Sequence, residues 1–355
     1  MRIKSFLLVL ILLLPALACT SSATPPPTEE VAPPTDAEVV AEPTATTPPP
    51  EPTAVEHKTI PGELPELQSG VVGDQDSSVT AGEKRAPGGD RFTFTRFERP
   101  FNSETMDEYY PVIDIQDGLF FEDDVWLYAV IHIKGDEASQ ELTGNYGFEL
   151  DLDVDGGGDW LVLVSNPVSS EWSTDGVGLW FDTNDDVGGE VPTTTDKTPA
   201  GGDGFETQVF GAATSDDPDM GWARISPDDP NTVQIAVKRD ILAGDKTYLV
   251  GLWAGNEDLD PALFDINDHF THEQAGAAVT ELDIYYPIKE VSALDNTCRM
   301  AVGFQPTGSE PGLCPLPPPP AGAEPSVDPG CPAEYLVCRN VSQIAVVIVC
   351  YCNQP

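Results

Sequence analysis

Basic residues are scarce in this sequence, and the short motifs that mark common enzyme sites are absent. Lys and Arg together number 17 against 60 Asp and Glu, which gives a formal charge of -43 at pH 7. A surface of this sign repels phosphate, so the composition argues against nucleic acid and favours cations or basic partners. The sequence has no G-x-S-x-G, no P-loop and no G-x-G-x-x-G stretch. We therefore expect a protein that is not an enzyme.

Long apolar runs are also missing, except close to the first residue. Arg2 and Lys4 precede an uncharged apolar stretch over residues 6–18. A helix of that length reaches about 20 Å, which is short of the roughly 30 Å hydrocarbon core of a bilayer. The stretch therefore predicts an export signal rather than a membrane span.

The residues that end this stretch suggest how the protein is anchored. Ala16, Leu17 and Ala18 stand before Cys19, which resembles the lipobox of bacterial lipoproteins, although that family prefers Leu where Ala16 stands. The resemblance implies cleavage after residue 18 and a lipid on Cys19 that binds the membrane. It also implies an extracytoplasmic location, at the cell surface or in the periplasm. The alternative is an ordinary secreted protein that is cleaved near Ala18.

Cysteine is absent over residues 20–297, and the remaining six cysteines lie close together near the end of the sequence. An even number of cysteines in an exported chain predicts disulfide bonds. Their spacings do not match the close cysteine pairs of zinc knuckles. The sequence leaves the pairing open among Cys298, Cys314, Cys331, Cys338, Cys350 and Cys352.

Composition divides the chain into four parts: a signal peptide (1–18), an anchored and disordered Pro/Thr/Glu-rich linker (19–90), a folded domain (91–290) and a Cys-rich segment (291–355). Short runs rich in aromatic and β-branched residues fill the third part, separated by Gly, Asp, Asn and Pro. This pattern of short apolar runs and turn residues predicts an all-β fold, an antiparallel β-sandwich. The predicted strands are 92–97, 125–133, 146–154, 160–164, 178–181, 233–237 and 248–253.

The clearest chemical signal is an acidic loop with the spacing of a calcium site. Asp151, Asp153, Asp155 and Asp159 occupy positions 1, 3, 5 and 9 of an EF-hand-like loop, with Gly156 at its turn position. Val162 stands where the bidentate Glu of an EF-hand belongs, so a complete EF-hand is excluded. The alternative is a solvated strand face that leads into a Gly-rich turn.

Two further groups of residues are candidate binding positions. Asp182, Asn184 and Asp186 form a second, looser acidic loop that could also bind calcium. Trp160 and Trp172 border polar loops and could stack on a sugar ring, although most tryptophans of a sandwich belong to its core.

Residues 114–253 resemble the carbohydrate-binding family 9 and DOMON-like β-sandwiches of secreted proteins. The resemblance is carried by residues 123–128 (DDVWLY), 146–153 (YGFELDLD) and 233–237 (VQIAV) followed by Ile241 and Leu242. It implies a sandwich that binds an extracellular ligand, carbohydrate in particular. We therefore expect a membrane-anchored lipoprotein that presents a calcium-stabilised, ligand-binding β-sandwich. The alternatives are a structural or adhesive surface protein without a small ligand and, least favoured, an extracytoplasmic hydrolase.

Overall fold

The computed structural model describes residues 55–316 with short gaps, together with 336–340 and 348–352. The gaps are 92–95, 104, 137–138, 140, 189–192, 197–202, 212–214, 257–258, 266–268 and 278. All described residues belong to the unit Ala54–Pro355. The other unit, Met1–Thr53, lies outside them, as do the predicted signal peptide and the cysteines Cys19 and Cys331.

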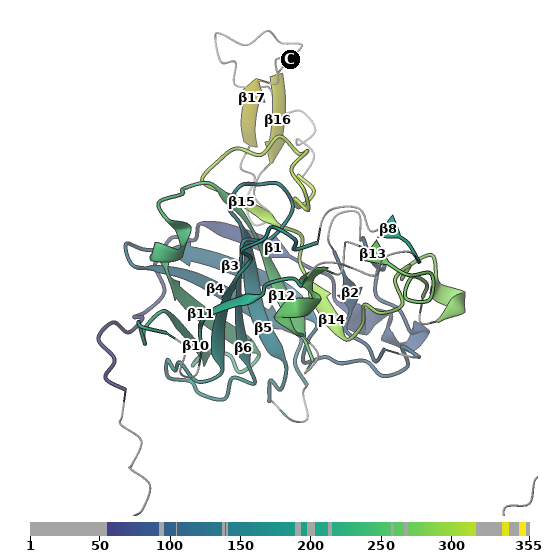
Figure 1. Cartoon of the computed structure of the whole chain (residues 1–355), viewed down its shortest axis with the longest axis horizontal. Helices are drawn as coiled ribbons and strands as arrows, with labels where there is room; N and C mark the ends of the chain where they lie inside the picture. The colour runs from purple at the N-terminus through teal and green to yellow at the C-terminus, as the bar shows by residue number, and fades with distance from the viewer. Residues whose placement is uncertain are drawn as a thin grey trace, which may run out of the picture. The chain divides into compact units, whose positions relative to one another are not determined.

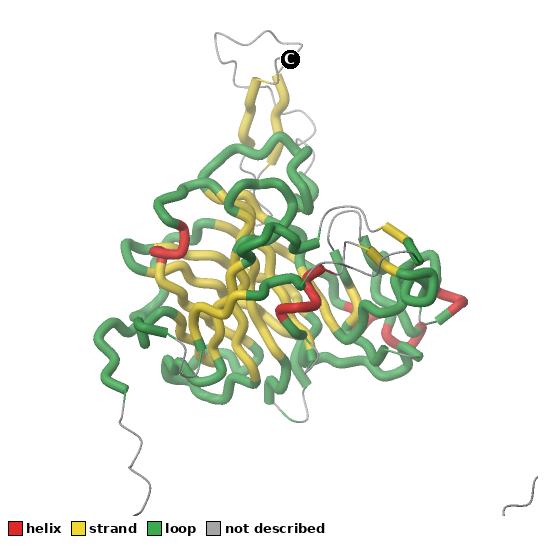
Figure 2. The backbone as a smooth tube through the Cα atoms, in the orientation of Figure 1, coloured by secondary structure: helices red, strands yellow, loops and turns green. Residues whose placement is uncertain are grey.

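Antiparallel sheets in a sandwich-like arrangement make up most of the regular secondary structure among the described residues, which confirms the predicted all-β class (Figures 1 and 2). The first sheet has the strand order β1 (Gly70–Gly73), β3 (Ile115–Glu122), β4 (Trp126–Ile133), β11 (Thr232–Lys238), β10 (Gly221–Ile225). The second has the order β2 (Glu98–Arg99), β14 (Leu294–Asn296), β12 (Tyr248–Gly255), β5 (Asn145–Asp151), β6 (Trp160–Ser165), β7 (Val177–Phe181), β9 (Thr207–Phe210), and β15 (Met300–Val302) also pairs with β12.

Smaller elements complete the described secondary structure. A parallel pair joins β8 (Thr193–Thr194) to β13 (His269–Phe270), and an antiparallel pair joins β16 (Leu336–Asn340) to β17 (Ile348–Cys352). The described helices are short 3₁₀ turns: η1 (Ser77–Val79), η2 (Ala81–Glu83), η4 (Arg239–Leu242), η5 (Pro261–Asp265) and η6 (Thr280–Leu282). No helix in the described part of the chain has the length and apolar character needed to cross a membrane.

The main core lies between the two large sheets, and the alternation of side chains along each strand produces it. In β4, Leu127, Ala129 and Ile131 join this core, whereas Tyr128 and Val130 belong to a separate apolar cluster on the other face of the strand. Successive side chains point to opposite faces of a sheet. Both sets are buried, so β4 is covered on both faces. A strand that is covered on both faces has an almost continuous apolar sequence, which explains the run WLYAVIHI of β4.

The first sheet extends into the segment that the sequence assigns to the linker (19–90). β1 pairs with β3, and Val72 of β1 is 2% exposed in the main core. Farther upstream, Lys58 and Thr59 donate their backbone N–H groups to the buried carboxylate of Asp219, at 2.8 Å each. The structured part of the chain therefore includes residues well before the predicted domain boundary at residue 91.

Candidate metal centre

The first acidic loop connects β5 to β6 and is folded around the carboxylate of Asp151, which is 0% exposed. The Oδ1 atom of Asp151 accepts hydrogen bonds from the backbone N–H groups of Val154 (2.6 Å) and Asp155 (3.3 Å). Its Oδ2 atom accepts from the N–H of Gly156 at 3.1 Å. Gly156 has φ +109°, a conformation that side-chain-bearing residues rarely adopt, so glycine allows the chain to turn back toward Asp151.

A buried arginine lies beneath this loop. Arg299 is 4% exposed and donates from Nη1 to Asp151 Oδ2 (3.1 Å) and to the carbonyl of Gly156 (2.7 Å). Its Nη2 pairs with Glu149, whose other carboxylate oxygen accepts from Trp253 Nε1 at 2.7 Å. Burial raises the pKa of Asp151 to about 7, against the opposing charge of Arg299. The carboxylate of Asp151 is thus paired with the guanidinium of Arg299 and accepts hydrogen bonds from three backbone N–H groups.

Three of the four predicted ligands of the first loop come together. Asp151, Asp153 and Asp159 each offer one oxygen, and these oxygens lie within 4.8 Å of one another. Partial desolvation in the loop raises the pKa of the exposed Asp153, and the charge of Asp155 adds to this shift. Burial also raises the pKa of Asp159, and the charges of Asp153 and Asp155 again add to it. A cation at this position would relieve the repulsion among these carboxylates. Asp155 is not part of the group, and its Oδ1 accepts from the N–H of Gly157 at 2.8 Å.

The second acidic loop follows β7 and repeats the same local design. Asp182 is 7% exposed, and its two carboxylate oxygens accept four backbone hydrogen bonds at 2.9–3.1 Å. The donors are the N–H groups of Asn184, Asp185, Asp186 and Val187. The two loops lie side by side because β6 and β7 are paired, and the N–H of Asp182 donates to the carbonyl of Asp159 at 3.0 Å.

Within the second loop, Asp186 differs from Asp182 in how its carboxylate is used. Its Oδ2 accepts from Asn184 Nδ2 (2.8 Å) and from the N–H of Asp203 (3.3 Å). Its Oδ1 is buried and has no hydrogen-bond partner. Burial raises the pKa of Asp186. The predicted residue Asn184 presents its amide nitrogen to both Asp186 and Asp203, so its side chain links two carboxylates here.

The two tryptophans that were predicted to bind a ligand are both packed against neighbouring side chains. Trp160 is half-buried, and its ring lies 4.7 Å from that of Phe181. Trp172 is also half-buried, with the guanidinium of Arg224 4.4 Å from the ring centre. Its indole N–H donates to the carbonyl of Gly62 at 3.1 Å. All six tryptophans of the chain are described, and none of them is exposed.

Of the six clustered cysteines, Cys298 and Cys314 form a disulfide bond. This bond closes the segment that holds Arg299, whose backbone N–H donates to the carbonyl of Gly312. Cys338 in β16 and Cys350 in β17 are register partners, and Cys352 is opposite Leu336. Since Cys331 lies outside the described residues, the pairing of these four cysteines stays a prediction.

No pattern in the sequence indicates that Arg299 supports the first loop. Glu149 precedes Asp151 by two residues on β5, whereas Arg299 comes from the short segment that the disulfide closes and pairs with both carboxylates. A lone arginine beside a cysteine does not indicate which carboxylate it will pair with. Comparison of the chain with family models, with curated proteins and with solved structures finds no match.

Proposed function

We propose that this chain is a lipid-anchored, extracytoplasmic protein that displays a calcium-binding β-sandwich. Calcium would bind in the first acidic loop through Asp151, Asp153 and Asp159, with the second loop as the adjoining acidic surface. The observation that carries the proposal is the convergence of three carboxylate oxygens within 4.8 Å at the β5–β6 turn. Closely spaced carboxylates are the hard oxygen ligands that calcium prefers.

The neighbouring loop supports a cation at this place. The charge of Asp185, in the second loop, acts on both Asp153 and Asp159 of the first loop and raises their pKa values further. Arg299 is buried under the loop and is already paired with Glu149 and Asp151. Negative charge therefore accumulates on the solvent side of the loops, where a divalent cation would neutralise it.

For the role of the displayed domain, the surroundings of the tryptophans favour a structural or adhesive module over a sugar-binding one. Stacking on a sugar requires an open aromatic face. Phe181 packs beside Trp160, and Arg224 lies over the ring of Trp172. The anchor on Cys19 and the Pro-rich segment behind it support a domain that is held away from a membrane surface.

Calcium titration with a melting measurement tests the proposal. The purified whole chain is treated with chelator, and its melting temperature is recorded with and without excess CaCl2. A variant that combines Asp153→Asn, Asp155→Asn and Asp159→Asn should show a smaller rise in melting temperature on addition of calcium, because the loop site is lost. At a calcium concentration about 100 times the Kd, one site adds about 2.7 kcal/mol to stability.

The matched control removes three exposed carboxylates elsewhere, through Asp124→Asn, Asp175→Asn and Asp245→Asn. It changes the net charge by the same amount and should keep the full calcium response. A loop variant whose response equals that of the unmodified protein would disprove calcium binding by the first loop. Radiolabelled lipid that is still incorporated after Cys19→Ala would disprove the anchor.

A further inference from the structure

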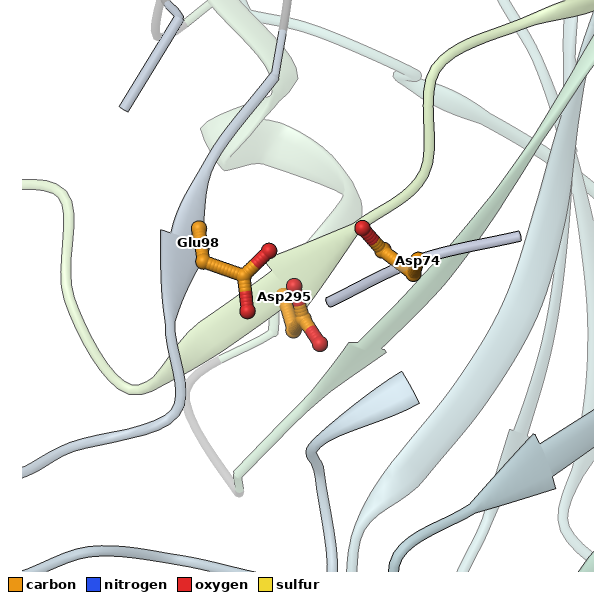
Figure 3. Close-up of side chains that lie close together, drawn as sticks. All are labelled: Asp74, Glu98 and Asp295. Carbon is orange, nitrogen blue, oxygen red and sulfur yellow. The ribbon is translucent and has the colours of Figure 1, made fainter. Parts of the chain in front are cut away.

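A second group of carboxylates lies inside the sandwich, remote in sequence from the acidic loops. Asp74 follows β1, Glu98 lies in β2 and Asp295 lies in β14. One oxygen from each of the three lies within 4.8 Å of the others, and their carboxyl groups face one another across the gap between these strands (Figure 3). The side chain of Asp74 is 0% exposed, and Glu98 and Asp295 are also 0% exposed. Because β1 belongs to the first large sheet, and β2 and β14 to the second, the cluster connects the two sheets.

Each of these carboxylates has one satisfied oxygen and one that is buried without a hydrogen-bond partner. Glu98 Oε1 accepts from Ser77 Oγ at 2.6 Å, and Asp295 Oδ2 accepts from the N–H of Ile115 at 2.7 Å. Asp74 Oδ1 pairs with Arg96. The unpartnered atoms are Asp74 Oδ2, Glu98 Oε2 and Asp295 Oδ1. A buried acceptor without a donor destabilises a fold, and three of them in one place call for a common partner.

The charges within the cluster do not balance. Arg96 pairs with Asp74, so ionisation of all three carboxylates would leave an excess of two negative charges beside one guanidinium. Burial and the charges of the neighbouring acids accordingly raise the pKa values of Glu98 and Asp295. A fourth carboxylate, Asp114, lies near enough for its charge to act on Glu98 and Asp295. Asp114 is itself satisfied, because it accepts from Tyr109, from Gln116 and from the backbone of Ser77. A water molecule has only two hydrogens to donate and no charge, so it cannot serve three carboxylate oxygens.

We propose that Asp74, Glu98 and Asp295 form a binding site for a divalent cation, calcium in particular, which joins the first strands of the domain to β14. The donor atoms are all carboxylate oxygens, which suits a hard cation and not zinc. Calcium lies 2.3–2.6 Å from its oxygen ligands, so two ligands on opposite sides of it are at most about 5 Å apart. The oxygens of the three carboxylates, which lie within 4.8 Å of one another, fit that geometry.

This site is independent of the calcium site proposed for the acidic loops. It has its own ligands, and its place in the structure gives it a different task. It would neutralise charge between the sheets and hold β1 and β2, which come early in the chain, against β14, which directly precedes the disulfide of Cys298. The bound cation is thus part of the folded core, whereas a cation in the loops would sit at the surface.

Calorimetric titration of the chelator-treated whole chain with CaCl2 tests the inference. Glu98→Gln keeps the size of the side chain and removes its charge, and it should bind one calcium ion fewer than the unmodified protein. Asp295→Asn should give the same loss and serves where Glu98→Gln does not fold. The control is Asp219→Asn, which removes a buried carboxylate whose oxygens accept from His57, Lys58 and Thr59. This control should bind as much calcium as the unmodified protein.

The loop variant (Asp153→Asn, Asp155→Asn, Asp159→Asn) separates this inference from the proposed function and leaves the cluster unmutated. If the cluster binds calcium, the loop variant still binds one ion, whether or not the loops bind another. If the loop variant binds no calcium, the inference is overturned, since the cluster would then hold shared protons instead of a cation. An unchanged calcium count in folded Glu98→Gln overturns it as well. Equal binding by the loop variant and the unmodified protein would instead contradict the loop site alone.

Discussion

The acidic loops and the buried carboxylate cluster contain similar groups of acids but satisfy them in different ways. In the loops, Asp151 and Asp182 each accept hydrogen bonds from backbone N–H groups a few residues farther along the chain. In the cluster, Asp74, Glu98 and Asp295 each keep one buried oxygen without a donor. Asp151 and Asp182 are thus satisfied within the protein, whereas the three cluster carboxylates are not.

The difference follows from what the backbone can offer in each place. At a turn, N–H groups are free of ladder bonds and can point at a nearby carboxylate. In paired strands most N–H groups are already used between neighbours, so carboxylates that project from β2 and β14 find few amide donors. A loop aspartate such as Asp151 or Asp182 can therefore be satisfied by the backbone, whereas a carboxylate between the sheets depends more on a counter-ion.

Removal of Arg299 should have the largest effect, because it turns the loop region into a second uncompensated cluster. Arg299→Gln leaves Glu149 and Asp151 buried without their cation. Loss of one partner from a buried ion pair costs about 3–5 kcal/mol. Urea unfolding in the presence of chelator measures the loss, and excess CaCl2 should restore part of it.

Arg224→Gln is the matched control for Arg299→Gln. Arg224 is also buried, but it contacts Gln234 and the ring of Trp172, and the carboxylate near it, Glu63, is exposed. Arg224→Gln should lower the free energy of unfolding by less than Arg299→Gln does. Equal costs would mean that Arg299 contributes packing alone and that the contrast between the two regions is wrong.

The cluster and the loops should respond to the loss of a charge by different amounts when calcium is removed. In chelator, Glu98→Gln relieves repulsion among buried carboxylates and should raise stability by about 1–2 kcal/mol. Asp153→Asn, at an exposed position, should change it by less than about 0.5 kcal/mol. In excess CaCl2, Glu98→Gln should become less stable than the unmodified protein, because it has lost a bound ion. Urea midpoints in both conditions give the comparison, and a Glu98→Gln variant that is destabilised in chelator would contradict it.

Much of the fold was predictable because side-chain alternation and turn residues act locally. The predicted runs 125–133, 160–164 and 248–253 correspond to β4, β6 and β12. The boundary at residue 91 was harder to predict, because β1 is a short strand, GVVG, within a Gly- and Asp-rich segment. Its burial comes from pairing with β3, which no local pattern indicates.

The two candidate sites also differ in how far the sequence predicts them. The first acidic loop could be predicted because its ligands are neighbours in the sequence and their spacing has a known chemical use. Asp74, Glu98 and Asp295 could not, because they are brought together by the pairing of β1 with β3, the pairing of β14 with β2 and the contact of Asp295 with Ile115. In a chain with 60 acids, single carboxylates at distant positions carry no signal by themselves.

A surface pair, His132 with Asp117, should show the smallest effect and gives a reference for acids that are neither buried nor metal-bound. The hydrogen bond from His132 to the Asp117 carboxylate raises the pKa of the imidazole above its usual value. This pair therefore adds stability below the unfolded pKa of His, about 6.5, and the gain is lost as the pH rises through the higher folded value. Both side chains are partly exposed, so water screens the pair and the change should stay below about 1 kcal/mol.

Urea unfolding in excess CaCl2, which keeps cation sites filled, should show a smaller fall in stability between about pH 6 and pH 8 for His132→Gln than for the unmodified protein. Asp117→Asn should reduce that fall equally, and a fall that neither variant reduces would show that the pair does not couple to folding.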